Sequence, residues 1–167
     1  MSVSRSSPTL LPARERAGHA SRGRAERGFV ALVIAAVLVL TTLPFIFAYT
    51  TAPPDRYFTG VMFNIPDHNQ YFAWMRDLSR QPLAANRLTA EPNEPALFHL
   101  LWWAAGRAGA ALGLEYGAVF GALRLLAVPL LLLSAYGFLR IAVPDTAQRR
   151  LAFALFAFAG GLGVVWV

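Results

Sequence analysis

Residues 29–49, FVALVIAAVLVLTTLPFIFAY, decide the fold class of this chain. The stretch has no charged side chain and ends at an aromatic residue. A helix needs about 20 consecutive apolar residues to cross the hydrocarbon core of a bilayer. A cleaved signal peptide has a shorter apolar region of about 7–15 residues and a small-residue cleavage site, and neither is found here. The stretch therefore predicts a transmembrane helix, and we expect an all-α membrane protein.

The composition of the whole chain agrees with residence in a membrane. Of its 167 residues 56% are hydrophobic and 14% are charged, whereas soluble domains average about 45–50% and about 25%. Every basic residue is arginine, which together with abundant Ala, Leu and Gly is typical of a GC-rich, bacterial genome. The absence of cysteine excludes disulfides, thiol catalysis and cysteine-bound metals.

The net charge of +6 does not indicate a nucleic-acid partner. Six arginines lie within residues 1–28, a segment without a nucleic-acid motif or apolar periodicity that is predicted to be a disordered tail. A short basic flank beside a span is a topology signal that marks the cytoplasmic side. We therefore expect a protein of the inner or plasma membrane, with its N-terminus in the cytoplasm and the lipid bilayer as its partner.

Two further apolar segments follow. Residues 118–139 predict a second transmembrane helix, which contains Pro129 as membrane helices tolerate. Residues 140–150 hold three arginines against one acid and predict a cytoplasmic loop. Residues 151–167 predict a third span, at the lower limit of about 17 residues. Because the chain ends inside this apolar segment, we expect the N-terminal fragment of a longer multi-pass protein.

Residues 50–117 are expected to form an extracytoplasmic loop with two interfacial helices. Residues 67–80 place Tyr71, Trp74, Met75 and Leu78 at helical spacing, opposite a charged face. Residues 96–112 are apolar but include a histidine, an arginine and a tryptophan pair, which favour the headgroup layer. If they crossed the membrane, the arginines of residues 140–150 would face outward, against the positive-inside rule. The expected architecture is a polytopic helical bundle with interfacial helices in its first outer loop.

Polar side chains of the outer loop supply candidates for chemistry. Asp67 begins the helix of residues 67–80 on the same face as Tyr71, where a carboxylate can serve as a general base. The pattern Asp67-x-x-Gln70 is also typical of a capping box, in which the first side chain accepts hydrogen bonds from backbone N–H groups. The sequence leaves both roles open.

Four other residues are candidates for binding. Glu91 and Glu94 form either a second acidic element or a solvated, proline-bounded turn. Together with His99 they are candidate ligands of a divalent cation, although their spacing matches no specific metal motif. No other cofactor is indicated. Arg124 lies inside the second span, where its charge requires a cavity, a partner or a phosphate, unless the side chain snorkels to the outer headgroups.

With these residues in view, the layout of residues 29–167 resembles the opening of the GT-C superfamily of polytopic glycosyltransferases. The most similar branch contains the protein O-mannosyltransferases and the aminoarabinose transferase of lipid A. Its members share an acidic first outer loop of the form D-E-x-x-Y-x-x-x-A-R, a proline-rich element, and an arginine near the outer end of the following span. The counterparts here are Asp67 with Tyr71, residues 91–95 (EPNEP), and Arg124, with His68 in place of the second acid.

The resemblance implies transfer of a sugar from a polyprenyl-phosphate donor to an extracytoplasmic acceptor. It implies Asp67 as the general base and Tyr71, Glu94 and Arg124 as substrate-binding residues. The sequence leaves two alternatives, a multi-pass transporter or lipid flippase, and a membrane protein without catalytic activity. The fragment alone is expected to be inactive, because later spans of the family are missing from it.

Overall fold

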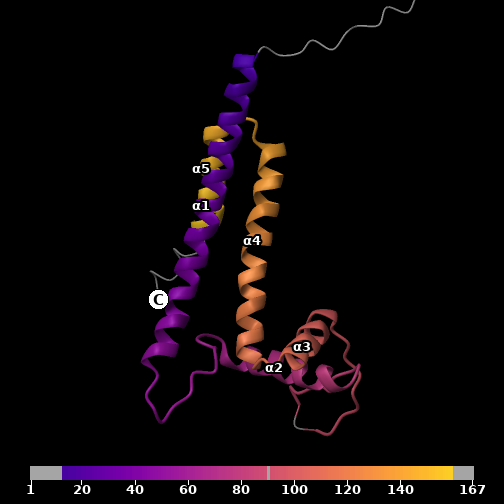
Figure 1. Ribbon diagram of the computed structural model, residues 1–167. Helices are drawn as coiled ribbons and strands as arrows, with labels where there is room; N and C mark the ends of the chain where they lie inside the picture. The colour runs from indigo at the N-terminus through magenta and orange to yellow at the C-terminus, as the bar shows by residue number, and fades with distance from the viewer. Residues whose placement is uncertain (1–12, 90, 160–167) are drawn as a thin grey trace, which may run out of the picture. The chain divides into compact units, whose positions relative to one another are not determined.

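The computed structural model describes residues 13–89 and 91–159, with side chains from residue 23 onward. Within them the chain forms five helices and no β-strand, apart from one isolated β-bridge between Ala84 and Leu97 (Figure 1). The helices are α1 (Ala13–Thr51), α2 (Ile65–Arg80), α3 (Leu100–Leu112), α4 (Tyr116–Ala142) and α5 (Thr146–Phe158). The expected all-helical class is therefore confirmed for the described residues.

Two helices are long and apolar enough to cross a membrane. They are Gly23–Thr51 within α1, with 29 residues, and Tyr116–Ala142, which is α4, with 27 residues. At about 1.5 Å per residue each reaches roughly 40 Å, which exceeds a hydrocarbon core of about 30 Å. Only 11% of the most apolar window of each helix is buried by the described residues. The uncovered apolar surface favours a membrane location over the core of a soluble protein.

The helix α1 begins earlier than the sequence predicted. Residues 13–28 were expected to belong to a disordered tail, yet the structure has continuous helix from Ala13. Alanine, arginine and glutamate are frequent in this segment and are strong helix formers. An existing helix is extended at small cost, because nucleation is the unfavourable step. Residues 1–12 lie outside the described part of the chain.

The boundaries of α4 and α5 also extend beyond the predicted spans. The helix α4 contains residues 118–139 and continues through Pro129. The helix α5 begins at Thr146 instead of residue 151, because the Asp145 carboxylate accepts a hydrogen bond from the Gln148 backbone at 2.9 Å and caps the helix. The predicted loop of residues 140–150 is reduced to residues 143–145, and residues 160–167 lie outside the described part.

The chain divides into two compact units, and each is considered by itself. Unit 1 comprises the residues up to Val37 and those from Leu132 onward. In it α5 lies beside α1 (Figure 1), and Phe153 is fully buried with its ring 6.3 Å from that of Phe29 and 5.0 Å from that of Tyr136. These edge-on contacts join the three helices of this unit.

An ion pair completes the packing of unit 1. Arg149 was expected in a cytoplasmic loop, but it is buried and donates to the Glu26 carboxylate from Nη2 at 2.6 Å and from Nε at 2.9 Å. The Tyr136 hydroxyl donates to the same carboxylate. A buried charge requires such a partner, which explains why Arg149 turns inward.

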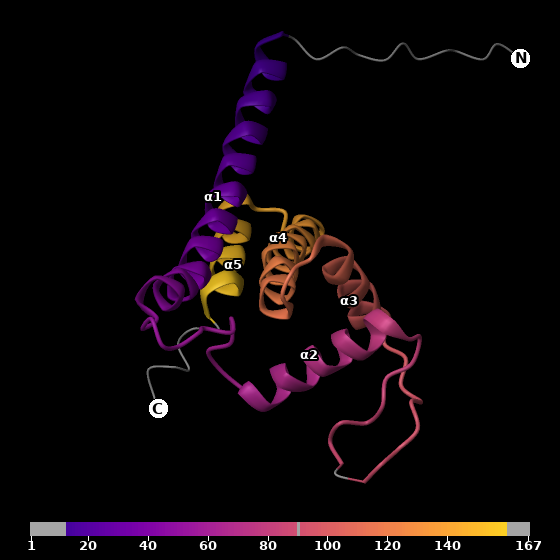
Figure 2. The same cartoon turned by 60° about the horizontal axis from the view of Figure 1, so that its bottom comes forward.

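Unit 2, Leu38–Leu131, is built around the contact between α2 and α3 (Figure 2). Its buried cluster consists of Met75, Leu78, Ala84, Trp102, Ala105 and Val119. Gly106 allows the close approach, because a Cβ there would lie 2.2 Å from the Met75 carbonyl oxygen. With 13 residues α3 is only about 20 Å long, shorter than a bilayer core. Its placement at the outer interface remains a prediction.

Candidate functional site

Asp67 lies in the first turn of α2 but does not cap the helix. The N-cap residue is Asn64, in the left-handed conformation at φ 51°, and Pro66 stands in the first turn, where proline is favoured. Of the two roles that the sequence left open for Asp67, the N-cap is therefore wrong, because the helix starts two residues before it. The Asp67 carboxylate accepts a hydrogen bond from the Asn64 side-chain amide and is otherwise exposed. An exposed carboxylate is accessible to a substrate hydroxyl.

Tyr71, one turn after Asp67, belongs to an aromatic cluster that joins α2 to α3 and α4. Its ring stacks on Trp102 with centroids 4.8 Å apart and lies parallel to Phe120 at 6.5 Å. His68 meets Phe120 edge-on at 4.6 Å. The cluster fixes the orientation of the first turn of α2, so packing is the structural role of the Tyr71 ring. Substrate binding by its hydroxyl remains a prediction.

Arg124 lies one turn after Phe120 on α4 and reaches α1 within unit 2. Its guanidinium donates to the Thr41 backbone carbonyl and, over 3.3 Å, to Oγ1 of Thr42. It also lies over the Phe45 ring, 4.4 Å from the centroid. The sequence left a cavity, a partner, a phosphate or snorkelling open, and the structure gives Arg124 partners on α1. The Nε–H is buried and has no hydrogen-bond partner among the described residues, so one donor of the group is unused.

A groove of about 410 Å³ opens beside Arg124. One wall is formed by small residues of α4, which include Gly117 and Gly121, and the other by Phe45, Ile46 and Tyr49 of α1. Such a surface can accept an apolar chain, while Arg124 provides a positive charge at its lining. The groove and the aromatic cluster thus meet on consecutive turns of α4, around Phe120 and Arg124.

The acids of residues 91–95 do not converge with these groups. Glu91 and Glu94 are exposed in the loop between α2 and α3, and no contact joins Glu94 to Asp67 or Arg124 in the described part of the chain. His99 stacks on Trp74 with centroids 6.2 Å apart. No group of three or more His, Cys, Asp or Glu side chains is placed to hold a metal ion within residues 23–89 and 91–159. Glu94 remains a predicted substrate contact without structural neighbours in the site.

Asp77 is a second charged residue, after Arg149, whose burial the sequence did not predict. It was assigned to a polar face, but it is 8% exposed and accepts hydrogen bonds from Arg87, from Nε at 3.0 Å and from Nη2 at 2.7 Å. Arg76 lies 3.5 Å from its other oxygen. The pair attaches the loop between α2 and α3 to the end of α2. Helical periodicity could not reveal it, because Arg87 lies outside the helix.

A second polar contact joins the segment between α1 and α2 to the segment between α3 and α4. The Tyr57 hydroxyl donates to the Glu115 carboxylate, and both residues are exposed. This hydrogen bond raises the pKa of Tyr57 above its ordinary value of 10.0, because the carboxylate stabilises the protonated phenol. At an exposed position the contact contributes little to stability.

Known proteins offer no relative against which this site can be aligned. A scan against protein-family models, a search of curated proteins and a search of solved structures each found no match to this chain. A function can therefore be inferred only from Asp67, the aromatic cluster and Arg124 themselves.

Proposed function

We propose that the chain is part of a multi-pass membrane glycosyltransferase that uses a polyprenyl-phosphate-linked sugar as donor and an extracytoplasmic acceptor. The observation that carries the proposal is the arrangement of unit 2. One aromatic cluster holds the turn that bears the exposed Asp67 and contacts α4 one turn before Arg124. An exposed carboxylate that can act as a base, and an arginine beside an apolar groove, are two elements that such a transfer requires. The resemblance to the GT-C layout agrees with this assignment.

Asp67 is the proposed general base. Its carboxylate takes the proton of the acceptor hydroxyl while the hydroxyl oxygen bonds to the anomeric carbon of the sugar. The bond from that carbon to the phosphate oxygen breaks, and the electron pair leaves with the lipid phosphate. Exposure supports this role, because within the described part of the chain the carboxylate accepts a side-chain hydrogen bond only from Asn64 and keeps lone pairs for a substrate.

Arg124 is the proposed contact of the leaving phosphate. Thr41 and Thr42 hold its guanidinium in place, and the unused Nε–H and the groove beside it support an anionic ligand with an apolar chain. Charge-assisted hydrogen bonds between arginine and phosphate are among the strongest in proteins. Tyr71 and Glu94 are the further proposed substrate contacts, through a hydroxyl and a carboxylate that can hydrogen-bond to sugar.

The proposed setting is the inner or plasma membrane of a bacterium, with the N-terminus in the cytoplasm and α2 and α3 at the outer surface. The positive-inside rule supports this orientation, because arginines are concentrated before residue 29 and again after residue 139. Of the second group Arg149 is neutralised by Glu26, so Arg140 and Arg150 supply the signal.

The substitution Asp67→Asn in the full protein tests the proposed base. Asparagine keeps the size of the side chain and can still accept the hydrogen bond from Asn64. We expect transfer from a polyprenyl-phosphate sugar to fall by about 10²–10⁴-fold, the usual contribution of a general base, with normal membrane insertion. Asp55→Asn is the matched control, because Asp55 is an exposed acid of the same region whose nearest charge is Arg56 at 3.9 Å. Undiminished transfer by the Asp67→Asn protein would exclude Asp67 as the base.

A further inference from the structure

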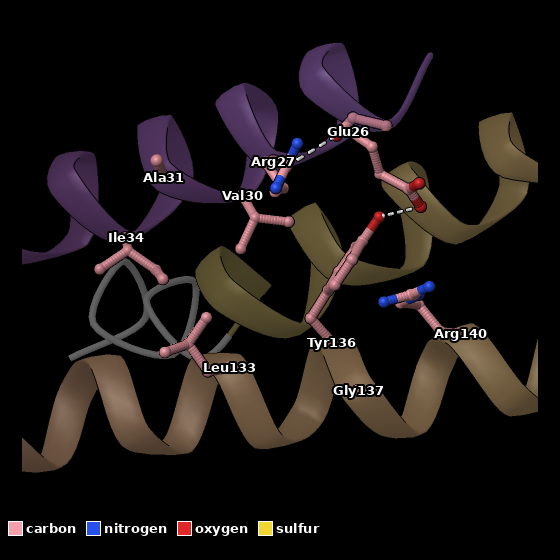
Figure 3. A pocket seen from close by; sticks show the side chains of 10 residues that line it. Glu26, Arg27, Val30, Ala31, Ile34, Leu133, Tyr136, Gly137 and Arg140 are labelled. Carbon is pink, nitrogen blue, oxygen red and sulfur yellow. Dashed lines mark hydrogen bonds between the residues drawn. The ribbon is translucent and has the colours of Figure 1, made fainter. Parts of the chain in front are cut away.

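Unit 1 contains a second groove, distinct from the proposed transfer site. It has a volume of about 620 Å³ and lies between α1 and α4 (Figure 3). Its apolar lining includes Val30 and Ile34 of α1 and Leu133 of α4. Gly137 widens it, because a Cβ at that position would meet no atom within 4 Å. We refer to it as the unit-1 groove.

The polar end of the unit-1 groove has an excess of positive charge. Arg27 and Arg140 line it, and both are exposed. Glu26 is the only carboxylate in the described lining of the groove, and it already accepts hydrogen bonds from Arg149 and Tyr136. Among the described residues Arg140 makes no hydrogen bond, and Arg27 donates only from Nε to the Gly23 carbonyl at 3.3 Å. Two guanidinium groups therefore keep most of their donors available.

The depth of these groups along the spans matches that of a lipid headgroup. Arg27 lies two residues before the uncharged apolar run of residues 29–49, and Arg140 directly follows the uncharged residues 125–139. At about 1.5 Å per residue Ile34 lies roughly 10 Å further along α1 than Arg27, inside the apolar run. The charge is thus at the membrane surface and the apolar lining extends into the core.

We propose that the unit-1 groove binds one anionic phospholipid of the bilayer. Its phosphate contacts Arg27 and Arg140, and one acyl chain follows Val30, Ile34 and Leu133. Charge complementarity identifies the occupant, because Glu26 offsets one of the three charges of Arg27, Arg140 and Arg149, and an apolar segment of protein would leave the other two without counter-charge. Basic pockets between transmembrane helices bind anionic headgroups in this way.

The test is lipid titration of the purified chain in detergent, with bound lipid counted by native mass spectrometry. Phosphatidylglycerol is the anionic probe and phosphatidylcholine the zwitterionic one. The double substitution Arg27→Gln and Arg140→Gln should weaken phosphatidylglycerol binding by about fivefold per arginine, roughly 25-fold together, and leave phosphatidylcholine unchanged. The matched control is Arg56→Gln with Arg80→Gln, which removes the same charge from exposed positions of unit 2.

A second variant fills the groove without altering its charge. Gly137→Leu places a side chain in open space and improves helix propensity, so the fold is retained. We expect it to lose the preference for phosphatidylglycerol, whereas Gly28→Leu, at an equally open position of α1 outside the lining of the groove, should keep it. Equal binding of both lipids by the unaltered chain would overturn the proposal. Equal phosphatidylglycerol binding by the arginine variant and its control, or displacement of the lipid by inorganic phosphate, would overturn it as well.

Discussion

The ion pair between the buried Asp77 and the half-exposed Arg87 predicts unequal losses of stability when one or the other partner is replaced. The Asp77 side chain is 8% exposed and that of Arg87 is 47% exposed. Replacing Arg87 by leucine leaves a buried carboxylate whose remaining charged neighbour is Arg76, at 3.5 Å. Replacing Asp77 by asparagine keeps an acceptor for Arg87, and the half-exposed guanidinium can be solvated. The substitution of the more exposed partner should therefore be the more damaging one.

The expected magnitudes follow from these exposures. Removing one partner of a buried ion pair costs roughly 3–5 kcal/mol, and because Arg76 remains nearby we expect the lower end, about 3 kcal/mol, for Arg87→Leu. Asp77→Asn exchanges a charged for a neutral hydrogen bond and should cost about 1 kcal/mol. For a chain of this size 1 kcal/mol corresponds to about 2–4 °C, so midpoints should fall by about 6–12 °C and about 2–4 °C.

The assay is thermal unfolding of the purified chain in detergent, followed by tryptophan fluorescence. Trp74 on α2 and the buried Trp102 report on the packing that the pair supports. Arg80→Leu is the control, because Arg80 is exposed and forms no ion pair with any residue that the structure describes. The double variant of Asp77 and Arg87 should be more stable than the sum of the single effects predicts. A midpoint for Arg87→Leu equal to that of the control, or above that of Asp77→Asn, would refute the reasoning.

Two further predictions concern a close helix contact and a titrating phenol. Gly106→Ala should lower the thermal midpoint by the equivalent of about 1–3 kcal/mol, because the new Cβ overlaps the Met75 carbonyl; Gly121→Ala, in open space, should not lower it. The raised pKa of Tyr57 means that its contact with Glu115 is present below pH 10 and is lost as the pH rises through the raised pKa. Comparison with Tyr57→Phe identifies the part of the tyrosinate absorbance that belongs to Tyr57. In Glu115→Gln this absorbance should therefore appear at lower pH, and an unchanged titration would contradict the hydrogen bond.

The parts of the fold that the sequence predicted are those that depend on local pattern. The spans at residues 29–49 and 118–139 follow from the length of uncharged apolar runs, and α2 follows from helical spacing. The early start of α1 was missed because a polar, arginine-rich segment resembles a disordered tail, although its residues favour helix. The start of α5 was missed because the Asp145 cap was not recognised.

The details of the site depended on partners that are distant in sequence. Arg149 contacts Glu26 across 123 positions and Arg124 contacts Thr41 across 83, and no local pattern links either pair. Asp77 was misplaced for the same reason. Asp67 is different, because Asn64 and Pro66 stand close enough to have identified the true helix start. The packing of Tyr71 against Phe120 could be expected only as a general tendency of aromatic residues.

The central claim is that α1 and α4 cross the membrane and present α2, with Asp67, on the outer side. The absence of native cysteine allows single cysteines to report on this directly. Asn69→Cys on α2 and Gln148→Cys on α5 are suitable, because both native side chains are exposed. The account predicts that a membrane-impermeant maleimide labels the first variant in intact cells and the second only after permeabilisation. Labelling of Gln148→Cys in intact cells, or protection of Asn69→Cys until permeabilisation, would contradict it.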